Sequence, residues 1–68
     1  MFKDTDFKNK TINGIELDQG QFHGCDFTTS TFGGCKFTNC EFIKCKFNSA
    51  SLLGVAFKNC TINQCDFT

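Results

Sequence analysis

The fold is decided by the stretch Cys25–Phe47, which reads CDFTTSTFGGCKFTNCEFIKCKF. A phenylalanine returns in it at every fifth residue, and each cysteine stands two residues before a phenylalanine. The same spacing, continued to both ends of the 68 residues, meets a large apolar residue at every step, and all ten phenylalanines are among them. These positions, called the phenylalanine slots below, are Phe2, Phe7, Ile12, Leu17, Phe22, Phe27, Phe32, Phe37, Phe42, Phe47, Leu52, Phe57, Ile62 and Phe67.

A repeat of five residues fits neither a regular helix nor a flat strand. In an α-helix, residues five apart are separated by about 140° around the axis, so the phenylalanines would cover every face. In a straight strand, residues five apart point to opposite faces, so the phenylalanines would alternate between core and water. A short extended segment followed by a corner, repeated along the chain, turns every phenylalanine toward one interior.

The residues next to each slot agree with this interpretation. The residue two before a slot faces the same way and is mostly small or apolar, whereas the residue one before it faces outward and is often charged, as at Asp26 and Lys36. Alternating large and small inward residues can fill a narrow interior. We therefore expect the structural core to combine the phenylalanine slots with all six cysteines, which are Cys25, Cys35, Cys40, Cys45, Cys60 and Cys65.

These residues resemble the pentapeptide-repeat family, whose repeat is a small residue, Asp or Asn, Leu or Phe, and two variable positions. The resemblance covers essentially the whole chain and implies an all-β fold, a right-handed parallel quadrilateral β-helix. Residues 1–68 would form one solenoid domain of about three and a half coils, each of four repeats. Periodicity alone does not separate a square section from a triangular one. The square is favoured by three glycines twenty residues apart, which suit a corner with positive φ: Gly14, Gly34 and Gly54.

Six cysteines in so short a chain would ordinarily predict a disulfide framework. Stacking at twenty residues instead gives parallel columns, one of Cys25, Cys45 and Cys65 and one of Cys40 and Cys60. Stacked neighbours would hold their Cβ atoms about 4.8 Å apart, beyond the usual disulfide range of about 3.5–4.5 Å. We expect free thiols that act as small buried hydrophobes. Zinc binding is the alternative, although parallel columns do not bring four sulfurs to one tetrahedral point.

Charge and motif content argue against several function classes. Seven lysines balance seven acidic residues, which speaks against nucleic acid or a membrane surface as a partner. No nucleophile, base and orienting group fall together, and no glycine-rich phosphate loop is present. The single histidine, His23, reads as an outward surface residue. We therefore expect no enzyme activity, no catalytic residue, no metal site and no cofactor.

The sequence also suggests a location. Phe2 follows Met1 directly and is in phase with the repeat, which leaves no apolar signal segment, and no apolar run approaches transmembrane length. Together with reduced thiols, this predicts a cytoplasmic protein.

The ends of the predicted solenoid suggest a function. Neither end carries an amphipathic helix that could cover the last coil, and an uncovered coil exposes unpaired strand edges and apolar side chains. We therefore expect a rigid structural or interaction module that forms homo-oligomers through its coil ends and can also bind a protein partner. An end-to-end filament would rotate successive copies by about half a turn, and a closed two-fold dimer is the competing arrangement.

The family resemblance implies an alternative function. Some pentapeptide-repeat proteins mimic duplex DNA, bind DNA gyrase and protect it from quinolones. Mimicry requires an acidic rod, but this chain has no net charge, and its one acidic column, Asp6, Asp26 and Asp66, is interrupted by Lys46. The predicted height of about 16 Å is also only half of the roughly 34 Å of one DNA turn.

Overall fold

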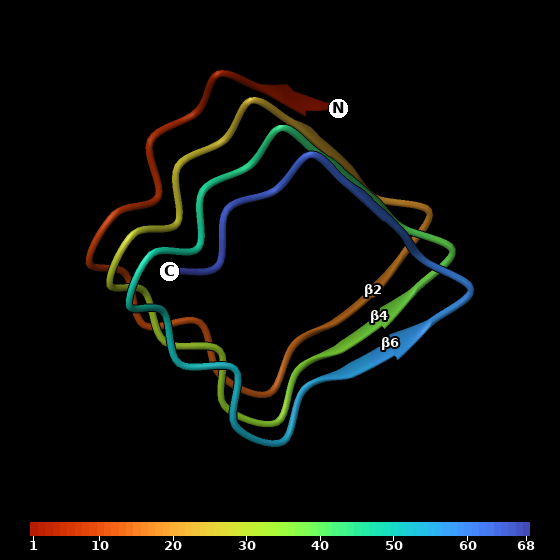
Figure 1. Ribbon diagram of the computed structural model, residues 1–68. Helices are drawn as coiled ribbons and strands as arrows, with labels where there is room; N and C mark the ends of the chain where they lie inside the picture. Colours follow the sequence, from red (N-terminus) through yellow and green to blue (C-terminus); the bar gives the residue numbers. More distant parts are fainter.

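The computed structural model describes all of residues 1–68 and contains short strands joined by corners, with no helix (Figure 1). No segment therefore forms a helix long and apolar enough to cross a membrane. One sheet holds four strands: β1 (Phe2–Lys3), β3 (Gln21–His23), β5 (Glu41–Ile43) and β7 (Thr61–Asn63). A second sheet holds three: β2 (Glu16–Asp18), β4 (Lys36–Thr38) and β6 (Ala56–Lys58).

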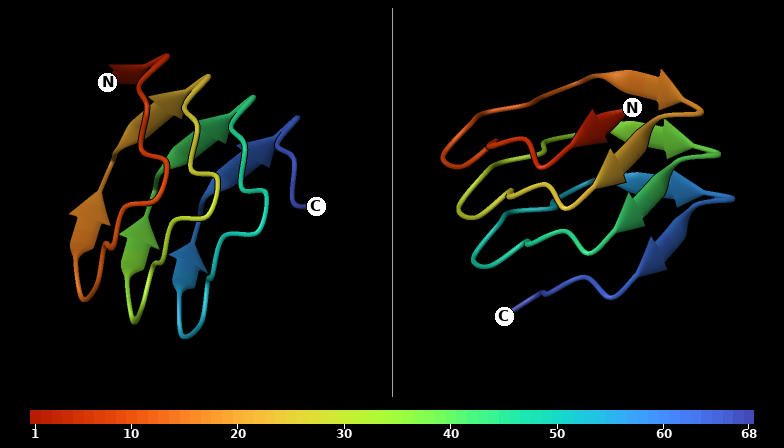
Figure 2. Two further views of the ribbon diagram at one scale, coloured as in Figure 1. Left: turned by 90° about the vertical axis from the view of Figure 1, so that its left-hand side faces the viewer. Right: turned by 90° about the horizontal axis from the view of Figure 1, so that it is seen from above.

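The strand register sets the size of a coil. All strand pairs are parallel and join residues twenty apart, so that Phe22 pairs with Phe2 on one side and with Phe42 on the other. The remaining two sides of each coil pair through single bridges with the same offset, such as Thr11 with Thr31. Twenty residues therefore make one coil of four sides, as the square outline in Figure 1 and the stacked coils in Figure 2 show. The predicted all-β parallel solenoid is confirmed, and the section is square.

The corners lie two residues after each phenylalanine slot and share one backbone conformation. Gly14, Gly34 and Gly54 have φ values of 68°, 66° and 74°, as a corner requires. Gly24 and nine other residues, all at the equivalent corner positions, also have positive φ, so the prediction of one such corner per coil was too narrow. At seven of the nine non-glycine corners the N–H donates to the next coil, as where the Asn9 N–H donates to the Thr28 carbonyl at 3.0 Å. Asn59 and Gln64 in the last coil hold the same φ without such a bond, so the conformation belongs to the corner itself.

The corner conformation makes Gly34 a test of backbone strain. A Cβ added at Gly34 would meet no atom within 4 Å, so Gly34→Val is expected to act mainly through the positive φ of this corner. It should lower the free energy of unfolding by about 1–2 kcal/mol, because L-residues, and β-branched ones above all, disfavour this region. Gly34→Asn is the matched control and should cost less, since asparagine already occupies other corners, such as Asn39. Urea unfolding followed by circular dichroism compares the two, and equal stabilities would contradict the explanation.

The core is a column of stacked aromatic rings. Rings in the same slot of successive coils lie 4.9–5.6 Å apart between centroids and within 18° of parallel. Rings on neighbouring sides meet edge to face, as Phe27 and Phe32 do at 5.3 Å. The buried apolar residues are Phe22, Phe27, Phe32, Phe37, Phe42, Phe47, Cys25, Cys35, Cys40 and Cys45.

Burial decreases toward both ends of the column. The side chains that are only partly buried include Phe7, Ile12, Leu17, Leu52, Cys60 and Cys65. The prediction that every phenylalanine slot lies in the core is wrong for four slots, which are exposed to solvent: Phe2 (46 % exposed), Phe57 (36 %), Ile62 (42 %) and Phe67 (52 %). Each of the three phenylalanines still stacks on the ring one coil inward. An inward side chain is buried only when one coil covers it on each side. The four exposed slots lie at the ends of the solenoid, where one of these two coils is absent.

Candidate functional site at the ends of the solenoid

The six cysteines are free, and their thiols have a role that the sequence interpretation missed. The Cys45 thiol donates a hydrogen bond to the Phe22 carbonyl at 3.2 Å, and the Cys65 thiol donates to the Phe42 carbonyl at 3.1 Å. The other four thiols likewise donate to the carbonyl 23 residues earlier, in the preceding coil. The thiols thus link each coil to the preceding one through the carbonyls of the slot residues.

One residue could have revealed this role from the sequence. Ser30 occupies the same kind of slot as the cysteines, is buried, and donates its hydroxyl to the Phe7 carbonyl. A serine in an otherwise apolar interior signals a hydrogen bond, because a buried hydroxyl without a partner is costly. Between residues 25 and 45, where the slot is fully buried, every occupant is a small side chain that is also a donor.

Burial also keeps the thiols chemically quiet. It raises the pKa of Cys45 to about 12 and also raises the pKa of Cys40. Both groups therefore stay protonated at neutral pH, and a protonated thiol is a poor nucleophile and metal ligand. No group of three or more His, Cys, Asp or Glu side chains is placed to hold a metal ion, so the zinc alternative finds no ligand set.

The acidic column on one side of the solenoid is occupied by local hydrogen bonds. Asp6, Asp26 and Asp66 each accept the main-chain N–H two residues later, at 2.9, 3.0 and 3.2 Å. The Thr28 hydroxyl also donates to Asp26 and, with the Thr28 N–H, lowers the pKa of this carboxyl. The ionised carboxylate stabilises the fold at neutral pH, and that contribution is lost as the pH falls through its folded pKa. Each of these aspartates uses its Oδ1 atom to hold its own turn.

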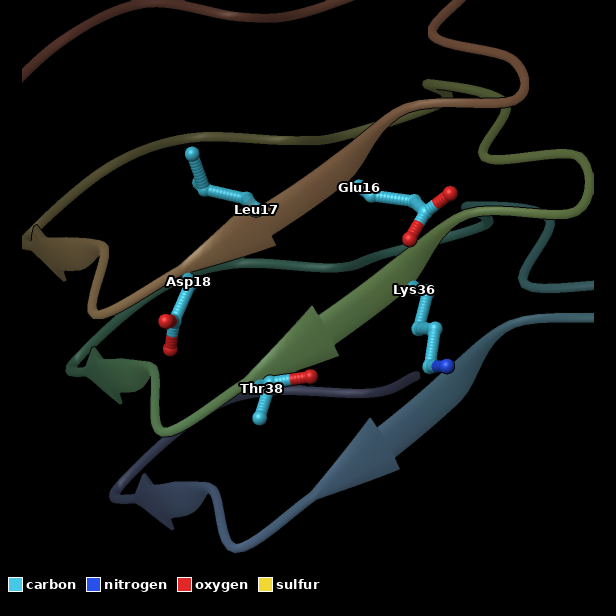
Figure 3. Close-up of a pocket in the computed structure, with 5 residues that line it drawn as sticks. All are labelled: Glu16, Leu17, Asp18, Lys36 and Thr38. Atoms are coloured by element: carbon cyan, nitrogen blue, oxygen red, sulfur yellow. The ribbon is translucent and has the colours of Figure 1, made fainter.

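A shallow depression of about 210 Å³ lies on the outer face of β2 and β4 (Figure 3). Its walls are formed by Glu16, Leu17, Asp18, Lys36 and Thr38. Asp18 accepts a hydrogen bond from the Asn39 side chain at 3.2 Å. The remaining charged groups, Glu16 and Lys36, are opposite in sign and exposed, so the depression has no dominant charge that would select a ligand.

The N-terminal end of the column contains an apolar hollow of about 290 Å³. It arises where the first coil has smaller side chains than the second, with Ile12 above Phe32 and Leu17 above Phe37. Its lining is wholly apolar and consists of Phe2, Phe7, Ile12, Ile15, Leu17, Phe22, Phe27, Phe32, Phe37 and Phe42.

The C-terminal end has a different shape. Phe57, Ile62 and Phe67 are exposed there, and Leu53 on the adjoining side is 82 % exposed. No comparable hollow is found at this end. The two ends of the solenoid are therefore both apolar but unlike each other.

The fold and the repeat define a β-solenoid built from five-residue units. The profile of the pentapeptide repeats family matches residues 25–64 as eight copies, and the chain belongs to this family. A search of curated proteins and a search of solved structures found no significant match. The matched range omits the first coil, in which the small slots hold less typical residues: Thr5, Lys10, Ile15 and Gly20.

Proposed function

We propose that this chain is a non-enzymatic structural or interaction module of the cytoplasm, which associates with itself through the ends of its solenoid and offers the same surfaces to protein partners. The observation that carries the proposal is the apolar character of both ends, the hollow beside Ile15 and Leu17 and the exposed Phe57, Ile62 and Phe67. Stacking a further coil on either end would cover these side chains and pair the free strand edges.

The area of the end faces limits how strongly two copies are expected to associate. The extents of 22 × 21 × 18 Å make each end face roughly 400 Å², so a stacked pair buries roughly 800 Å² in total. Specific, stable interfaces usually bury about 1,200–2,000 Å². We therefore expect a weak association.

Sedimentation of the 68-residue chain between about 10 µM and 1 mM tests the proposal. The average mass should rise with concentration, and a constant monomer mass over this range would overturn it. Phe67→Lys places a charge at one end and should weaken association at least tenfold, since a buried unpaired charge is costly. Thr31→Lys, which places the same charge on a side, is the control and should leave association unchanged.

The DNA-mimic alternative is not favoured by any feature of the structure. The longest extent of the molecule is 22 Å, shorter than the roughly 34 Å of one DNA turn. The net charge is zero, and the aspartates of the acidic column are bonded to their own turns.

A further inference from the structure

We infer that two copies meet head to tail, with the C-terminal coil of one copy filling the N-terminal hollow of the next. This inference rests on the self-association proposed above, and adds which surfaces meet and in which register. It selects a heterologous contact, which can extend into a filament, over a closed two-fold dimer.

The shapes of the ends argue for unlike surfaces in contact. In a two-fold contact the same surface meets itself. Two N-terminal ends would face two hollows of about 290 Å³ toward each other and leave a void, which close-packed interiors disfavour. Two C-terminal ends would bring the exposed Phe57, Ile62 and Phe67 together with no hollow to receive them. Only the head-to-tail contact offers apolar side chains to an apolar hollow.

The direction of the strands favours the same arrangement. Every pair within the molecule is parallel, and the same slot recurs twenty residues later in each coil. A copy added head to tail continues these parallel ladders and the ring stacking. A two-fold contact would instead oppose antiparallel edges and interrupt both patterns.

The repeat then fixes the register. If the next copy continues the five-residue spacing after Phe67, its Phe2 stacks against Leu52 and its Phe7 against Phe57. Its Ile12 then stacks against Ile62, and its Leu17 against Phe67. This places the most exposed slot of the C-terminal end, Phe67, against the wall of the hollow that Leu17 forms.

The same register also brings like charges together. Lys8 of the next copy comes above Lys58, and Glu16 of the next copy comes above Asp66. All four side chains are exposed, so the repulsion is modest and screened by salt. These two contacts keep the association weak and supply a test that is specific to the register.

Complementation between end variants tests the direction of the contact. Ile15→Asp places a short charged side chain in the hollow, and Phe67→Asp places one on the opposite end; both sites are exposed, so the fold should survive, as circular dichroism would verify. Head-to-tail contact predicts that each variant alone is a monomer and that an equal mixture forms dimers and nothing longer. If Ile15→Asp or Phe67→Asp alone still forms dimers, the contact is two-fold and the inference is overturned.

A charge exchange tests the register. Lys58→Glu should strengthen association about two- to fivefold, because it places a carboxylate below Lys8 of the next copy. Adding Lys8→Glu to that variant should return it to the weaker association. No change in either variant would overturn the proposed register. A wild-type chain that stays monomeric would instead overturn the proposed function itself, so the two failures are distinguishable.

Discussion

Phe27→Ala is expected to unfold the protein or bring it close to unfolding. The Phe27 side chain is 1 % exposed and stacks between the rings of Phe7 and Phe47, with centroids 5.0 Å away on each side. Removing a buried phenylalanine ring usually costs about 3–5 kcal/mol. A chain of 68 residues has a total stability of roughly 3–10 kcal/mol, so this one change removes a large part of it.

The control for this change is the equivalent truncation in the same column at the end of the solenoid. Phe67→Ala removes a ring that is 52 % exposed and stacks on one side only, against Phe47. It should cost about 1 kcal/mol, because less apolar area returns to water. Urea unfolding followed by circular dichroism measures both variants. Similar losses at the two positions would show that the column is not the source of stability.

Alkaline pH is expected to destabilise the fold strongly. In the unfolded chain the Cys45 thiol loses its proton near its ordinary pKa of 9.0, whereas burial raises its pKa in the folded chain to about 12. Because the folded pKa is the higher one, the stabilisation is complete below pH 9 and is lost as the pH rises from 9 to 12. The loss is at most about 1.4 kcal/mol per pH unit for each such thiol. Cys40, whose pKa burial also raises, adds to it.

The measurement is the free energy of unfolding in urea at pH values from 7 to 10.5, with a reductant present to keep the thiols from oxidising. The matched variant is Cys40→Ser with Cys45→Ser, since Ser30 shows that the slot accepts a hydroxyl that donates to a carbonyl. Its stability should fall less steeply above pH 9 than that of the wild type. Parallel slopes would mean that other groups cause the alkaline loss.

The interior of this fold could be predicted from the sequence because one spacing controls it. Large inward residues such as Phe27 and small ones such as Cys45 each recur every five residues. The four-sided coil was implied by the family resemblance and favoured by the glycines of one corner, not by the period alone. The corners themselves were predicted, but the positive φ at most of them was not, because asparagine, threonine and lysine there give no glycine signal. At seven of the nine non-glycine corners the N–H also donates to the next coil, a contact that only the folded chain contains.

The candidate site was predictable only in outline. The sequence indicated that the ends of a short solenoid would be apolar, but the hollow depends on volumes in two coils, such as Leu17 above Phe37. The thiol hydrogen bonds join residues 23 apart in neighbouring coils, and the five-residue pattern does not show which carbonyl each thiol reaches. Outward positions such as Lys36 and Thr38 vary from coil to coil, so the repeat carries no information about a partner's chemistry.

The uniform offset of twenty residues has a consequence for how the molecule could change its length. Each coil contacts only the coils before and after it, and every fourth corner returns the chain to the same position on the square. A duplicated segment such as 28–47 would enter as one complete turn whose neighbours supply the contacts it already has. Gene duplication could therefore lengthen this protein one turn at a time, each insertion leaving the rest of the structure undisturbed and adding stability through one more interface.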